Sequence, residues 1–169
     1  MIKSSRSGSV SVTYTDKGLG KLFAELAALS ELVLSVGLLG SERYPGGESV
    51  ATVGAILEFG SEHNPARPWM RRAVIRNAPR IEAAQAHEYT RVALGEQSAV
   101  DAHAAVGKLI AELMIDSIDT ASAWAMPNTA DTISAKSTTS PLRATGKLRS
   151  SISWQVATKD GAVKRRGKP

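Results

Sequence analysis

Two nearby prolines, Pro65 and Pro68, most constrain how this chain can fold. Proline fixes its own φ angle and has no backbone N–H, so a continuous helix cannot cross this segment. An apolar run ending in Glu58, Phe59 and Gly60 stands before the prolines, and a basic helical pattern follows them. Gly60 suits the position after a helix, where a left-handed residue is common. The sequence therefore predicts a rigid corner between two helices, with Phe59 buried beneath it.

Periodicity predicts three elements before this corner. Residues 8–15 alternate valine and tyrosine with small polar side chains, as a half-buried strand does. Residues 16–29 place leucines and Phe23 on one face of a helix. Residues 31–40 are apolar on both sides, which predicts the central strand of a sheet. After a turn-rich loop, Ser49 can cap the short helix that ends at the corner.

After the corner the pattern is mainly helical. A helix is predicted over residues 68–94, although Pro79 should kink or divide it. Asn77 is expected to cap the second half, because proline is tolerated in the first turn of a helix. A further helix is predicted over residues 100–119, with a broad apolar stripe that suits burial.

The composition changes in the C-terminal part of the chain. The Ser/Thr-rich residues 120–140 are predicted to form a long mobile arm. Alternation resumes in a final strand near residues 148–156, and the basic residues 160–169 are predicted to form a disordered tail. The order of elements predicts a single α+β domain over residues 1–169. It would have a small, mostly antiparallel sheet, helices packed on one face, and a long mobile loop before the last strand.

Composition limits the class of protein. A chain of 169 residues can bury a core without metal or disulfide bonds. The lack of cysteine excludes a disulfide framework, a thiolate zinc site and a cysteine nucleophile. The formal net charge of +5 favours an acidic neighbour without identifying it. The sequence shows no secretion signal and no membrane-length apolar stretch, so we expect no contact with a membrane.

Three patterns match catalytic or metal-binding motifs only in part. The glycines of DKGLGKL lack the spacing and the hydroxyl residue of a phosphate-binding loop. In HEYTR, Arg91 occupies the second ligand position of a zinc-protease helix and would repel a metal, so His87 and Glu88 are interpreted as surface residues. Glu58 lacks a neighbouring nucleophile and is interpreted as the partner of Arg67, of an arginine on the following helix, or of one on another subunit. No cofactor, metal site or catalytic residue is predicted.

Arginines form the most regular charged pattern. Arg72, Arg76 and Arg80 recur at every fourth position and form one stripe on the predicted helix. Such a stripe can follow the phosphates of DNA, pair with carboxylates of another subunit, or remain a solvated face. Three apolar residues of the same helix are expected to face the core: Met70, Val74 and Ile81.

The corner resembles the signature of a family of tailed-phage neck and tail-completion proteins, also called phage virion morphogenesis proteins. The matching residues are Glu58-Phe59-Gly60 after an alanine-rich helix and Pro65-Ala66-Arg67-Pro68-Trp69 before the next one. A second motif of the family is similar to residues near the C-terminus, at Pro141, Leu142, Thr145, Gly146, Leu148, Arg149, Ser151 and Ile152. Arg143 and Ala144 depart from that motif, where an aliphatic residue and an aspartate are usual.

The resemblance implies a non-enzymatic virion protein of the neck or tail, assembled in the host cytoplasm. It would form a homo-oligomeric ring, with a hexamer as one candidate, that joins the head–tail connector or stopper to the tail tube or terminator protein. DNA in the lumen would touch the ring only passively. The implied interface residues are Glu58, Phe59, Gly60, Pro65, Arg67, Pro68, Trp69, Arg72, Arg76, Thr145, Gly146, Leu148 and Arg149.

Within this picture, Phe59 is expected to anchor the corner to the core and Trp69 to fill a pocket at an interface. Replacing Arg67 or Trp69 by alanine is therefore expected to leave the subunit folded and to block head–tail joining. Two alternatives stay open. One is a tail terminator, a related ring component, and the other is a small basic nucleic-acid-binding protein.

Overall fold

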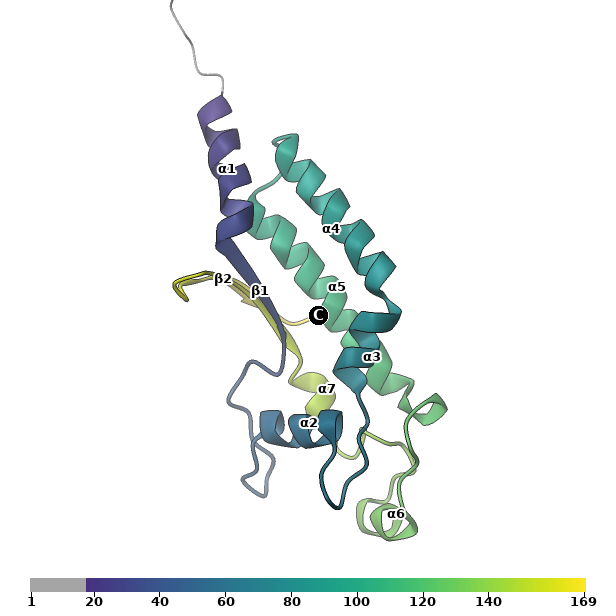
Figure 1. Cartoon of the computed structure of the whole chain (residues 1–169). Helices are drawn as coiled ribbons and strands as arrows, with labels where there is room; N and C mark the ends of the chain where they lie inside the picture. Colours follow the sequence, from purple (N-terminus) through teal and green to yellow (C-terminus); the bar gives the residue numbers. More distant parts are fainter. Residues whose placement is uncertain (1–17) are drawn as a thin grey trace, which may run out of the picture.

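The computed structural model describes residues 18–169. The strand predicted for residues 8–15 lies outside the described residues. In Figure 1, α4 and α5 lie side by side, α1 lies toward one end of the molecule, and α2, α6 and α7 lie toward the other. The elements are α1 (Leu19–Glu31), β1 (Leu32–Gly37), α2 (Val50–Phe59), α3 (Trp69–Arg76), α4 (Ala78–Ala93), α5 (Ala99–Asp119), η1 (Ala121–Ala123), α6 (Ala130–Lys136), α7 (Lys147–Ser150), β2 (Ser153–Thr158) and β3 (Val163–Gly167).

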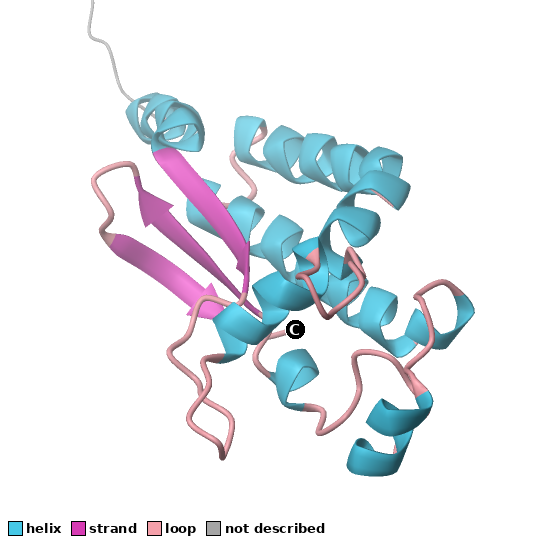
Figure 2. Cartoon of the chain, turned by 60° about the horizontal axis from the view of Figure 1, so that its bottom comes forward, coloured by secondary structure: helices cyan, strands magenta, loops and turns pink. Residues whose placement is uncertain are grey.

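The sheet has three antiparallel strands within the described residues, in the order β1-β2-β3, and the helices lie to one side of it (Figure 2). Helix α5 packs on β1 and β2, and Gly107 makes this close approach possible. A Cβ atom at Gly107 would lie 2.7 Å from Leu34 Cδ1 and 3.2 Å from Trp154 Cβ, so a larger residue here would force these side chains to move. The predicted α+β class, with helices packed on a small antiparallel sheet, is confirmed.

Helix α5 forms the centre of the core, and the helix predicted over residues 100–119 is confirmed. Ser98 caps it, because its Oγ accepts a hydrogen bond of 3.1 Å from the Asp101 N–H. Val106, Leu113 and Met114 of the predicted apolar stripe are buried. The buried hydrophobic cluster contains Val50, Trp69, Ala73, Ala104, Ala111, Leu113, Met114, Ile118, Leu148, Ile152, Trp154 and Val156.

The helix predicted over residues 68–94 is divided, as expected, into α3 and α4, with Pro79 in the first turn of α4. The expectation that Asn77 caps the start of α4 is wrong, because its side chain caps the end of α3 instead. Its side-chain Nδ2 donates a 2.8 Å hydrogen bond to the Ala73 carbonyl at the end of α3 and makes no cap for α4. Val74 is also exposed rather than turned to the core, and Ala73 is buried in its place.

Strand order differs from the prediction. The apolar segment 31–40 contains β1, which pairs only with β2 among the described residues, so β2 and not β1 is the central strand. The final strand was expected to start near residue 148, but residues 147–150 form helix α7 and β2 begins at Ser153. The predicted disordered tail contains β3, which pairs with β2. Its sequence, VKRRG, lacks the apolar alternation that marks a strand.

Residues 120–140 are not one long loop. They contain η1 and the seven-residue helix α6, whose N-terminus is capped by Thr129. The Thr129 Oγ1 accepts a 3.3 Å hydrogen bond from the Thr132 N–H, which is a local signal that outweighs the scarcity of large apolar residues. The mobility of this arm stays a prediction.

Candidate functional site at the corner between α2 and α3

Gly60 ends helix α2 and turns the chain toward the two prolines. Its φ angle is positive, at +81°, but its ψ angle of 175° lies outside the left-handed helical region that the sequence predicted; its N–H donates a 2.8 Å hydrogen bond to the Ile56 carbonyl. A Cβ atom at this position would lie 3.0 Å from the Ala66 backbone nitrogen. Glycine is therefore required here both by the backbone angle and by the returning chain.

Glu58 joins the two sides of the corner from within. This buried carboxylate accepts hydrogen bonds of 2.8 Å from the Met70 N–H and 3.1 Å from the Arg71 N–H, which are free donors of the first turn of α3. The Arg71 side chain adds a 2.9 Å ion pair from Nε and a 3.0 Å hydrogen bond from Nη2 to the Glu58 carbonyl. Of the three partners considered for Glu58, the arginine of the following helix is confirmed.

Arg67 connects the corner to the arm of residues 120–140. Its buried guanidinium donates hydrogen bonds to the carbonyls of Met126 at 2.9 Å and Pro127 at 3.3 Å, and to Asn128 Oδ1 at 3.4 Å. Burial lowers the pKa of Arg67, yet its donors are matched by carbonyl dipoles. Arg67 therefore serves the inside of the subunit and is not a surface contact as implied.

The two aromatic residues of the corner have the opposite burial from that expected. Phe59 does not anchor the loop to the core, since 68% of it is exposed, and Arg71 lies over its ring at 5.1 Å. Trp69 is fully buried in the core of the same chain and does not face outward. Its Nε1 lies 3.5 Å from the Gly54 carbonyl of α2. At the corner, Trp69 is therefore buried and Phe59 is exposed to solvent.

An apolar groove of about 440 Å³ lies beside Phe59. It is formed where the end of β1 passes α2 and the start of α3, and Leu39 and Ile56 are further exposed apolar residues of this region. The groove and the exposed ring form one surface, which we call the corner surface. It is lined by Val36, Gly37, Leu38, Leu39, Ala51, Gly54, Ala55, Glu58, Phe59, Met70 and Arg71.

The second motif of the resemblance packs against this corner. Helix α7 packs on α2, and Leu148 is buried in the common core (Figure 1). Gly146 precedes α7 with a φ angle of +71°, and Thr145 Oγ1 accepts a 3.3 Å hydrogen bond from the Lys147 N–H. Arg149 pairs with Asp119 at 3.0 Å. Leu148 therefore packs inside the subunit and is not exposed at an interface.

The predicted arginine stripe is divided by the break between α3 and α4. Arg72 and Arg76 line a polar pocket between α3 and α5, whereas Arg80 lies on α4 outside it. The Arg72 guanidinium stacks over Trp124 at 4.7 Å from the ring centroid. Sequence reasoning missed Trp124 and predicted an arginine of this helix as a partner of Glu58 without identifying it as Arg71.

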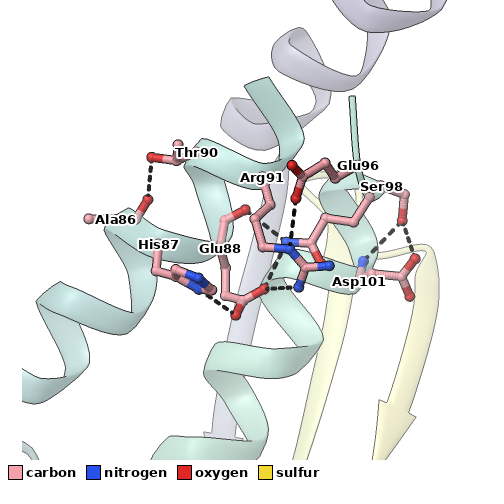
Figure 3. Close-up of polar contacts among 9 residues, drawn as sticks. Ala86, His87, Glu88, Thr90, Arg91, Glu96, Ser98 and Asp101 are labelled. Carbon is pink, nitrogen blue, oxygen red and sulfur yellow. Dashed lines mark hydrogen bonds and ion pairs between the residues drawn. The ribbon is translucent and has the colours of Figure 1, made fainter. Parts of the chain in front are cut away.

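The partial zinc-protease motif forms a polar network instead (Figure 3). Glu88 accepts hydrogen bonds from Gln97 at 2.8 Å and His87 at 3.1 Å, and pairs with Arg91 at 3.3 Å. The Gln97 hydrogen bond lowers the pKa of Glu88 most, burial opposes it, and His87 and Arg91 lower it further. This network joins the end of α4 to the turn before α5. No cluster of ligands for a metal is found within residues 18–169.

Comparison with known proteins gives no match to a family model, to a curated protein or to a solved structure. None of the helices in the described part of the chain combines the length and hydropathy needed to cross a membrane.

Proposed function

We propose that this chain is a structural protein of a tailed-phage particle, acting at the head–tail junction as a neck or tail-completion protein. In this role it joins the connector to the tail tube as one copy of a ring. The meeting of the two motifs in space supports the proposal. Gly54 of the first motif region lies so near Leu148 of the second that a Cβ atom there would be 3.3 Å from Leu148 Cδ1. Both motifs thus build one corner of one subunit.

The observation that carries the proposal is the contrast between the inside and the outside of this corner. The Glu58 carboxylate and the Arg67 guanidinium form hydrogen bonds with backbone groups of the same chain, which fixes the corner before any partner binds. Phe59 stands exposed on that fixed base beside an apolar groove. A rigid surface with an exposed aromatic residue binds with a low ordering cost, which suits an assembly protein.

The position of a second exposed aromatic residue favours another copy of this chain as the partner that occupies the groove beside Phe59. The chain has two phenylalanines. Phe59 on α2 is 68% exposed and Phe23 on α1 is 61% exposed. Their helices lie toward opposite ends of the molecule (Figure 1). When the two contact surfaces of a subunit differ, copies join head to tail and close into a ring if the rotation permits.

Light scattering over a range of protein concentration tests this proposal. The wild-type subunit is expected to be monomeric when dilute and to associate as its concentration rises or when connector and tail-tube proteins are added. Phe59→Ser should abolish association without a change in the circular dichroism spectrum. Ile75→Ser is the matched control, because Ile75 is 71% exposed on α3 and does not line the corner surface. A tight dimer at every concentration, or equal loss of association in both variants, would contradict the proposal.

A further inference from the structure

A second surface feature lies on the other side of α3, in the pocket of about 360 Å³ between α3 and α5. Its floor is buried and its rim is charged. Ala73, Leu113 and Ser117 are buried, whereas Arg76 and Asp116 are exposed. The lining residues are Arg72, Ala73, Arg76, Asn77, Leu113, Asp116, Ser117 and Thr120. The pocket is therefore polar and open to solvent at the rim.

The two arginine side chains of this pocket have no acidic partner within residues 18–169, whereas Asn77 donates a hydrogen bond to the Ala73 carbonyl and Thr120 donates one to the Asp116 carbonyl. Arg72 and Arg76 take no part in the ion pairs between described residues, and Arg72 makes only its stacking contact with Trp124. Ser117 is 5% exposed, and its Oγ has no hydrogen-bond partner in the described part of the chain. With less than 1 Å² of accessible surface, the Ser117 Oγ lies beneath the pocket floor and cannot touch a ligand, so these two unpaired guanidiniums are what indicate one.

The charges at the rim indicate the sign of that ligand. Two guanidiniums and one carboxylate, that of Asp116, line the pocket, so positive charge is in excess. Burial, and then repulsion from Arg76, lower the pKa of Arg72. An anion between the two guanidiniums would offset this repulsion. Trp124 holds the Arg72 guanidinium in place through the stacking contact, so this donor is already oriented.

We propose that this pocket binds a phosphate group. The two guanidiniums supply many N–H donors in fixed planes. This number of donors suits the several oxygens of a phosphate better than the two oxygens of a carboxylate. The proposal does not depend on the virion role, because none of these lining residues belongs to the corner surface.

Titration calorimetry with inorganic phosphate at low salt tests the site. Arg76→Gln should weaken phosphate binding about tenfold or more, since it removes a charged donor. Asp116→Asn should strengthen binding several-fold by removing the opposing charge. Arg80→Gln is the matched control, because Arg80 is exposed outside the pocket and its loss changes the net charge equally. No phosphate binding, or equal weakening by Arg76→Gln and Arg80→Gln, would overturn the proposal.

A short DNA duplex distinguishes the two sources of a phosphate group. If the ligand is a phosphate of the DNA backbone, fluorescence anisotropy should show DNA binding that Arg76→Gln weakens much more than Arg80→Gln and that inorganic phosphate displaces. If the ligand is free phosphate or a phosphate ester, calorimetry should show the binding described above, while DNA affinity responds equally to both variants. Either result supports the site and identifies the source of the phosphate group, whereas the absence of phosphate binding in calorimetry overturns it.

Discussion

Glu58 shows how a single side chain can set the geometry of the corner. The first N–H groups of a helix have no partner within that helix, and α3 begins at Trp69 without a side-chain cap from Pro68. Glu58 supplies the missing acceptor from the end of α2, at 2.8 Å from the Met70 N–H. The negative charge of the carboxylate also interacts favourably with the positive, N-terminal end of the α3 dipole. Glu58 therefore fixes the rotation of α3, which turns Trp69 inward.

This rotation makes Trp69 a core residue, so we predict that Trp69→Ala destabilises the subunit by about 3–5 kcal/mol. The expected loss replaces the earlier expectation that the variant folds normally and fails only in assembly. Urea unfolding followed by circular dichroism measures it. Ile75→Ala, on the exposed face of the same helix, should change the free energy of unfolding by less than about 0.5 kcal/mol. Near-equal effects of the two substitutions would show that Trp69 is not packed as described.

Glu88 gives a prediction for pH. Its pKa is lowered in the folded chain, mainly by the Gln97 hydrogen bond, so the ionised form stabilises the fold. That contribution is complete above the unfolded glutamate pKa of about 4.3 and is lost as the pH falls through the lower folded pKa. Glu88→Gln should therefore lower the free energy of unfolding by about 1 kcal/mol at pH 7. The difference from wild type should shrink below about pH 4; a difference independent of pH would exclude this role.

Among the structural elements, the arm of residues 120–140 depends on one distant side chain. Arg67 reaches across to the carbonyls of Met126 and Pro127, so the arm and the corner are held together by a planar group with several donors. Trp124, at the start of the arm, donates a 2.9 Å hydrogen bond from Nε1 to the Ser117 carbonyl and stacks under Arg72. The arm is therefore attached at two points.

We predict that Arg67→Lys loosens this arm while α3 and α5 stay protected, because a lysine ammonium cannot match the fork of a guanidinium. Hydrogen exchange measured by mass spectrometry should show faster exchange over residues 121–136. Arg143→Lys is a matched control, since Arg143 makes only an exposed 3.8 Å contact with Asp119. Unchanged exchange in Arg67→Lys would mean that the arm is held by other contacts.

Elements defined by local sequence rules could be predicted, whereas elements defined by contacts between distant residues could not. Helix α5, the cap at Ser49, the turn at Gly60 and the break at Pro79 depend on local rules, and the sequence predicted them. The orientation of α3 depends on Glu58, which is distant in sequence, so periodicity placed Val74 inward when it lies outside. Strand β3 was missed for the same reason. Its basic residues form a strand by pairing with β2, and Arg165 pairs with Asp101 of α5.

The candidate site was predicted in part. The sequence identified the corner, the partner class of Glu58 and the two motifs. It misplaced Phe59, Trp69 and Arg67, because aromatic and charged residues at a turn between two helices give no local sign of which side faces the core. The pocket between α3 and α5 was not recognised, because its α5 residues and the Trp124 ring that stacks on Arg72 lie far from the arginines in sequence.

At the scale of the whole molecule, the proposed ring requires that α1 of one copy contacts the corner surface of the next. The chain has no cysteine, so single cysteines can be introduced without background. Ala27→Cys lies one turn from Phe23 on α1, and Ala55→Cys lies one turn from Phe59 on α2; both alanines are exposed, and both phenylalanines are retained.

Cross-linking with a short bis-maleimide, at a concentration where light scattering detects association, measures this contact directly. A mixture of the Ala27→Cys and Ala55→Cys subunits should give a cross-linked dimer, and a mixture of Ala27→Cys with Ala86→Cys, an exposed position on α4, should not. Cross-links between two Ala55→Cys subunits with none in the first mixture would show a symmetric contact and contradict the head-to-tail ring.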